Sequence, residues 1–257
     1  MTERLTRHTN EVLTRALCLA AVVSRSVAED FIATGDSSPG FDAYMGVEPK
    51  HAPSVIAKWV EREGLVQAFS PQEKAYMAKP AGKWTRQETI DGNWRGEALV
   101  ALEWALQIVQ PMPLADVQIP MEDALEGAWL LKETSGLRKQ ASLLPPAEIH
   151  KQRDVAEFWL WRSRTWKLEH YSEEKLSEYK VSKENLRAIV DQAAAKGEKD
   201  GLFRCIEADF PAFGKPFRAL DDREWTKMNS SLTERLYGLN WICNIDGLEW
   251  DDVETST

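Results

Sequence analysis

The most apolar stretch of the chain runs from Trp94 to Val109, and it limits how the other segments can be arranged. Its apolar residues surround a helical wheel on every side instead of forming a single stripe. They are Trp94, Ala98, Leu99, Val100, Ala101, Leu102, Trp104, Ala105, Leu106, Ile108 and Val109. A helix that is apolar all round is buried by neighbouring elements. The stretch therefore predicts a central helix with other helices packed around it.

Helical spacing of apolar residues recurs along the rest of the chain. The predicted helices cover residues 9–27, 54–63, 70–79, 121–133, 146–166, 182–195 and 221–242. Two of them begin with the pattern of a capping box, Ser70 with Glu73 and Asp221 with Glu224. Three prolines exclude a helix over residues 111–120, and residues 202–217 favour a short strand or a packed loop. These patterns predict a mainly α protein, one multi-helical domain over residues 1–257 with at most a minor β element.

Residues 34–53 are rich in Gly, Ser and Pro, and they predict a long surface loop. Most of the 11 tryptophans fall within the predicted helices, where core packing is the expected role. In this tryptophan-rich chain, we therefore expect most of the tryptophan side chains to lie in the core between the helices.

The net charge, the apolar segments and the cysteines indicate which classes of protein can be excluded and which compartment is expected. The net charge of -9 argues against nucleic-acid binding, which needs a basic surface. No segment has the length of apolar sequence that a membrane span requires. The three cysteines, Cys18, Cys205 and Cys243, are odd in number and far apart, which is typical of a reducing compartment. We expect a soluble cytoplasmic protein.

The common catalytic signatures are missing from the sequence. There is no phosphate-binding loop, dinucleotide fingerprint, zinc-protease motif or nucleophile elbow. The four histidines supply a single Glu-x-x-His pattern, Glu48 with His51, whereas a di-iron bundle needs this pattern on each of two helices. We therefore expect no cofactor and no metal.

Charged and polar residues embedded in the apolar helices are the candidate site residues. They are Arg95, Glu97 and Glu103 on the central helix, Arg162 and Arg164 on the 146–166 helix, and Glu234, Arg235 and Asn240 on the last. A buried lone charge is costly, so each must find a partner or reach water. One interpretation is a set of interhelical ion pairs. The other is a polar pocket in which Glu97 or Glu103 acts as a general base and the arginines hold a small anion.

Several blocks of the chain together carry a family resemblance. They are 14–25, 59–64 with 70–74, 94–98 with 103–106, 209–218, 234–241, 250–253 and 255–257. With them the chain resembles the bacterial domain-of-unknown-function 4272 family over most of its length. The resemblance implies a soluble, mainly helical bacterial protein in which the C-terminal tail, 249–257, is an ordered part of the domain. It assigns no activity.

The chain departs from the family pattern in two places. Family members usually have Glu-Arg-His where this chain has Glu234-Arg235-Leu236, so a catalytic histidine there would be lost. Residues 34–53 look like an addition to the family pattern. The leading hypothesis is a non-enzymatic module that binds a protein partner or a small ligand. The alternative is an enzyme, such as a hydrolase, with a Glu/Arg pocket in its helical core.

Overall fold

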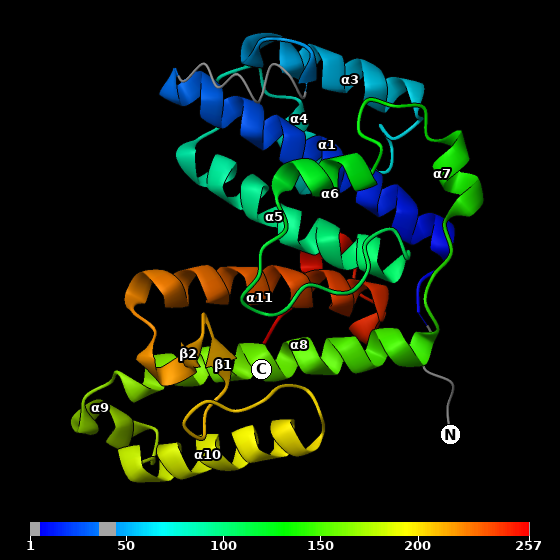
Figure 1. Ribbon diagram of the computed structural model, residues 1–257. Coiled ribbons are helices and arrows are strands. Elements are labelled where there is room, and N and C mark those ends of the chain that lie inside the picture. Colours follow the sequence, from blue (N-terminus) through cyan, green and yellow to red (C-terminus); the bar gives the residue numbers. More distant parts are fainter. Residues whose placement is uncertain (1–5, 36–44, 257) are drawn as a thin grey trace.

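The central helix is α5 (Arg86–Ala105), which lies between α1 (Thr9–Thr34) and α11 (Asp222–Ile242). The computed structural model describes residues 6–35 and 45–256 (Figure 1). Every residue from Gly96 to Ala105 is buried, which confirms the predicted burial of this helix. Its predicted bounds were wrong at both ends. A capping box between Thr85 and Glu88 starts the helix earlier, and a positive φ of 62° at Gln107 leaves Ile108 and Val109 outside it.

The long helices are stacked in the order α3, α1, α5, α11, α8 and α10 (Figure 1). The other helices form two groups, one on each side of the three innermost helices α1, α5 and α11. The first group, next to α1, contains α3 (Ala52–Arg62), with α4 (Pro71–Met77), α6 (Met121–Gly127) and α7 (Ser135–Gln140). The second group contains α8 (Pro146–Glu169), α9 (Glu173–Glu178) and α10 (Lys183–Lys199). Since α5 has a helix on either side, its apolar residues are covered all round.

Two glycines allow the three innermost helices to approach closely. A Cβ on Gly92 of α5 would lie 2.6 Å from the Cβ of Ser26 on α1. A Cβ on Gly238 of α11 would lie 3.1 Å from the carbonyl oxygen of Ala98. Any larger residue would therefore push α5 away from one of its neighbours.

The one sheet of the described residues is an antiparallel hairpin, β1 (Pro211–Ala212) with β2 (Lys215–Pro216), and an isolated bridge pairs Ile206 with Asp209. Pro211 pairs with Pro216, and Ala212 pairs with Lys215. The turn residues Phe213 and Gly214 both have positive φ, as a two-residue type I′ turn requires. Because the other regular elements are helices, the prediction of a mainly α fold is confirmed.

The predicted helix over residues 121–133 was too long. It ends at Gly127, because Trp129 and Leu131 take positive φ values of 52° and 61° that no helix contains. Of the twenty residues of the predicted loop 34–53, nine (36–44) lie outside the described residues. In its described part, η1 (Pro49–His51) leads directly into α3.

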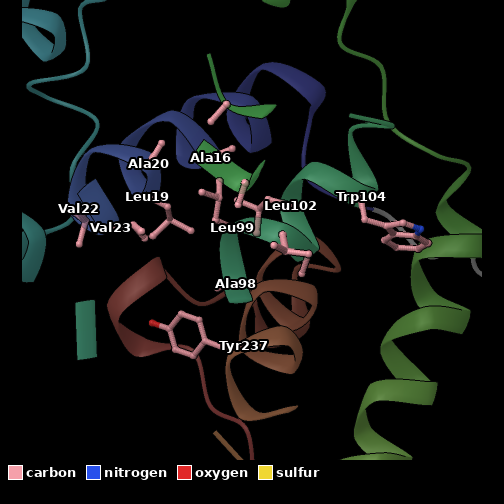
Figure 2. Close-up of a cluster of buried hydrophobic side chains, with 14 of the residues drawn as sticks. Ala16, Leu19, Ala20, Val22, Val23, Ala98, Leu99, Leu102, Trp104 and Tyr237 are labelled. Atoms are coloured by element: carbon pink, nitrogen blue, oxygen red, sulfur yellow. The ribbon is translucent and has the colours of Figure 1, made fainter. Parts of the chain in front are cut away.

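Most of the buried hydrophobic side chains form one continuous cluster, which does not include Leu176, Leu186 and Val190 of α9 and α10. Figure 2 shows its centre, where Leu19 and Val23 of α1 lie close to Leu99 and Leu102 of α5. Tyr237 of α11 closes the cluster from the other side. Among the described helices, none combines the length and the apolar character that crossing a membrane would require.

Candidate functional site

A polar pocket of about 190 Å³ lies beside the first half of α5. Its walls come from α1, α4, α5, α11 and the C-terminal turn η4 (Trp250–Asp252). The lining residues are Val22, Gln72, Glu73, Tyr76, Asp91, Gly92, Arg95, Glu234 and Trp250. The pocket is smaller than the roughly 300 Å³ at which drug-sized ligand sites begin. It therefore has room for a small polar molecule only.

Glu73 is held at the pocket by the start of α4. The Ser70 hydroxyl accepts a hydrogen bond from the Glu73 amide, and Glu73 Oε2 accepts one from the Ser70 amide at 2.8 Å. This is the predicted capping box, and it is confirmed. Arg15 of α1 donates to the same Oε2 and to the carbonyl oxygen of Ala68. Glu73 Oε1 is buried, and no hydrogen-bond donor reaches it from the described residues.

The opposite wall of the pocket is an ion pair between α5 and α11. Arg95 Nη1 donates to Glu234 Oε2 at 3.0 Å, and its guanidinium lies 4.2 Å from the centre of the Tyr237 ring. Burial raises the pKa of Glu234, although the charge and the hydrogen bond of Arg95 oppose that rise. Arg95 is therefore already engaged by a carboxylate and an aromatic face.

The C-terminal turn closes the pocket from a third side. Trp250 is buried, with ring centres 4.8 Å from Tyr237 and 5.4 Å from Trp241. The Tyr237 hydroxyl donates to the Trp250 carbonyl oxygen. Asp251 Oδ2 accepts a hydrogen bond from the Gln72 amide at 2.9 Å, while its Oδ1 is buried with no partner in the described chain. The tail thus contributes both an aromatic wall and a second carboxylate oxygen without a donor.

Carboxylates outnumber cations around the pocket. Among the described residues that line it or hydrogen-bond to its lining, the carboxylates are Glu73, Asp91, Glu234 and Asp251. The cations are the guanidinium groups of Arg15 and Arg95 and the ammonium group of Lys79, which lies 6.0 Å from the centre of the Tyr76 ring. Buried charge is costly unless it is paired. The arrangement can therefore accept hydrogen bonds from a bound molecule more readily than it can donate them.

Two of the candidate residues, Glu97 and Arg235, pair with each other instead of lining this pocket. Arg235 Nε donates to Glu97 Oε2 at 2.7 Å. The other nitrogens of Arg235 donate to the carbonyl oxygens of Pro113, Leu114 and Val117. The pair therefore ties α11 to α5 and to the extended segment 111–120. Glu97 also borders a separate cavity of about 270 Å³.

The candidates on α8 lie in the second group of helices. Arg162 is fully buried and donates to both oxygens of Asp209, at 2.8 and 2.9 Å, and to Glu169 at 3.0 Å. Arg164 is half-buried on the same helix, where burial lowers the pKa of its guanidinium. The structure thus brings only Arg95 and Glu234, of all the candidates, to the polar pocket.

Asn240 and Glu103 occupy two further environments. Asn240 accepts from Arg153 Nε and donates to the Glu254 carbonyl oxygen, both at 2.8 Å, so it fastens the tail. Glu103 is fully buried, and neither carboxylate oxygen has a partner among the described residues. Burial alone raises its pKa well above the ordinary value. Its carboxylate is packed against Gly127, where a Cβ would lie 2.8 Å from Oε1.

Four charged residues of the site or its immediate surroundings were absent from the candidates, namely Arg15, Glu73, Asp91 and Asp251. Glu73 belongs to the resemblance block 70–74, and the role recognised for it was the capping box, which uses one of its two oxygens. Arg15 and Asp251 belong to blocks of the family resemblance, and that membership was the available signal for them. Asp91 has no such signal, because an exposed aspartate in the first half of a helix is an ordinary surface residue.

The protein is therefore an α-helical protein with a small polar pocket beside its central helix. The chain belongs to the family described as Domain of unknown function (DUF4272), whose model matches residues 1–189. Glu234 and Trp250 lie beyond the matched residues, so the matched part supplies the walls from α1, α4 and α5. No match was found among curated proteins or among solved structures.

Proposed function

We propose that this protein is a non-enzymatic binding module and that its polar pocket holds a small ligand. The observation that carries the proposal is Glu73 Oε1, a buried oxygen of a pocket-lining carboxylate that no donor satisfies among the described residues. An unsatisfied buried polar group costs roughly 1–3 kcal/mol. A ligand that supplies the missing hydrogen bond recovers this free energy.

Binding is favoured over catalysis by the environments of the two carboxylates first considered as bases. The Glu97 carboxylate is engaged by Arg235. The Glu103 carboxylate is packed against Gly127 and does not line the polar pocket. A general base must come within hydrogen-bond reach of the proton that it removes. These contacts support a module that binds without converting its ligand.

We also propose that the protein works in the cytoplasm. Cys18 and Cys205 are free thiols, and Cys18 is buried. Unpaired cysteines are typical of a reducing compartment. Fractionation of the native cells, followed by immunoblotting, tests this proposal, and recovery in a membrane or secreted fraction would contradict it.

The experiment for the binding function is an NMR screen of the ¹⁵N-labelled protein with small cationic, neutral and anionic compounds. We expect at least one compound to shift the amide signals of Asp91, Gly92 and Arg95 in a saturable way. The same compound, incubated with the protein and followed by NMR, should stay chemically unchanged. Signals that respond only in other parts of the protein would contradict a site in this pocket, and turnover of the compound would favour the enzymatic alternative.

A further inference from the structure

We infer that the ligand of the polar pocket is a small organic cation that presents N–H donors, an ammonium or a guanidinium group. This inference rests on the proposed function and names the chemistry of the ligand. It concerns the part of the pocket bounded by Glu73, Asp91 and Glu234.

The first argument is a free acceptor at the pocket. Glu73 has only 5% of its surface exposed, yet its Oε1 receives no hydrogen bond from the described residues. An ionised carboxylate can only accept hydrogen bonds. A molecule that satisfies Glu73 Oε1 in the pocket must therefore donate.

The second argument is that the nearby cations are already engaged, Lys79 by Glu88 at 2.5 Å and the two arginines as follows. Arg95 is paired with Glu234 and stacked on Tyr237. Arg15 donates to Glu73 and to the Ala68 carbonyl oxygen, and it lies 5.2 Å from the centre of the Trp250 ring. An anionic ligand would have to displace these contacts, and it would also meet the unpaired carboxylate oxygen of Glu73. A cation meets the excess of negative charge directly.

The third argument concerns the kind of cation. Within the described residues, no group of three or more His, Cys, Asp or Glu side chains is arranged to hold a metal ion. The carboxylates instead stand on separate walls, on α4, α5 and α11. A cavity of about 190 Å³ has room for about six water-sized groups. These dimensions suit an ammonium or guanidinium group on a short apolar stem.

The test is an NMR titration with four compounds of similar size at constant ionic strength. They are n-propylammonium, tetramethylammonium, 1-propanol and propanoate. We expect n-propylammonium to shift the Gly92 and Arg95 amides at the lowest concentration. Tetramethylammonium, which has the charge but no N–H donor, should bind more weakly. If propanoate or 1-propanol binds as well as n-propylammonium, the inference fails while the proposed function stands; if no compound of any class shifts these amides, the proposed function fails.

Two variants connect the titration to the carboxylates. Glu73→Gln replaces one acceptor with a donor, and we expect it to weaken n-propylammonium binding by about tenfold, because hydrogen bonds to charged groups are the stronger ones. Asp91→Asn should weaken it by about threefold, since Asp91 is exposed and its attraction is screened by water.

Controls for folding accompany both variants. Glu184→Gln removes an exposed carboxylate on α10 and should leave binding unchanged. Should Glu73→Gln fail to fold, Asp91→Asn still tests the inference, because its side chain is not part of the core. Unchanged n-propylammonium affinity in the folded carboxylate variants would overturn the inference.

Discussion

Arg162 on α8 and Arg95 on α5 both bind carboxylates inside the stacked helices, but their surroundings differ. Asp209, the partner of Arg162, is fully buried and both of its oxygens are used. Oδ1 also accepts from the Phe210 amide, and Oδ2 accepts from the amide and the Nε of Arg218. Around Arg95, carboxylates are in excess and the Oε1 of Glu73 has no donor in the described chain.

The difference separates two uses of buried charge. A carboxylate whose hydrogen bonds are complete holds elements together, as Asp209 joins α8 to the segment around the β hairpin. A carboxylate oxygen that has no donor at a cavity does not hold two elements together, and it lowers the free energy of unfolding. We therefore interpret the Arg162 cluster as structural and the polar pocket as a binding site.

The largest effect is expected at the Arg162 cluster, in which both Asp209 oxygens are used and only Arg162 Nη1 is buried without a partner among the described residues. Asp209→Ala leaves the fully buried Arg162 with Glu169 as its remaining carboxylate partner. Breaking a buried ion pair by removing one partner costs about 3–5 kcal/mol. Urea unfolding should show a loss of that size in the free energy of unfolding. The control is Asp200→Asn, which removes an exposed partner of Lys196 and should cost less than about 1 kcal/mol. Equal losses in the free energy of unfolding for Asp209→Ala and Asp200→Asn would contradict the structural role of the Arg162 cluster.

An intermediate effect is expected at Glu103, which is unpaired like Glu73 but does not line the polar pocket. Glu103→Met replaces the carboxyl with an apolar side chain of similar length. We expect the free energy of unfolding to rise by about 1–3 kcal/mol at neutral pH, because the desolvation penalty disappears. Thermal and urea unfolding measure the change. A variant that is less stable than the wild type would show that the carboxyl has a partner after all.

Glu103 also gives the protein a pH dependence. Burial raises the folded-state pKa of Glu103 above its unfolded value of about 4.3. The folded state therefore binds more protons than the unfolded state above that pH, and stability falls as the pH rises toward the raised pKa. Glu103→Gln cannot ionise, so its stability should vary less with pH than that of the wild type. Parallel pH profiles for the two proteins would contradict this assignment.

The smallest effect on stability is expected at the mouth of the polar pocket. Asp91 is exposed, and its Oδ1 accepts from Gln87 at 2.7 Å. Asp91→Asn should change the free energy of unfolding by less than about 0.5 kcal/mol. It should nevertheless weaken the binding of n-propylammonium, which separates binding from stability at this residue. A stability loss comparable to that of Asp209→Ala would mean that the two clusters do not differ in kind.

The sequence was informative where local pattern determines structure. The apolar run at 94–109 predicted a buried helix because no stripe of polar residues interrupts it. The Ser70 and Asp221 capping boxes were predicted because their partners lie three residues away. The end of the 121–133 helix was missed, because positive φ at Trp129 and Leu131 leaves no mark in the spacing of apolar residues.

The site depended on contacts between distant segments, and these could not be predicted. Glu97 and Arg235 were both candidates, but their pairing joins residues 138 positions apart. Arg95 pairs with Glu234 across 139 positions. Glu73 gained its importance from Arg15, 58 residues earlier, which occupies one oxygen and leaves the other free. Spacing identifies which side chains need partners, whereas only the packed helices determine which of them remain without one.

A crystal structure of the protein soaked with n-propylammonium tests the central claim most directly. We expect the ammonium nitrogen to lie within hydrogen-bond distance of Glu73 Oε1, at about 2.7–3.2 Å, with Arg95 still paired to Glu234. Density for the ligand at other sites only, with a protein donor satisfying Glu73 Oε1, would contradict the account.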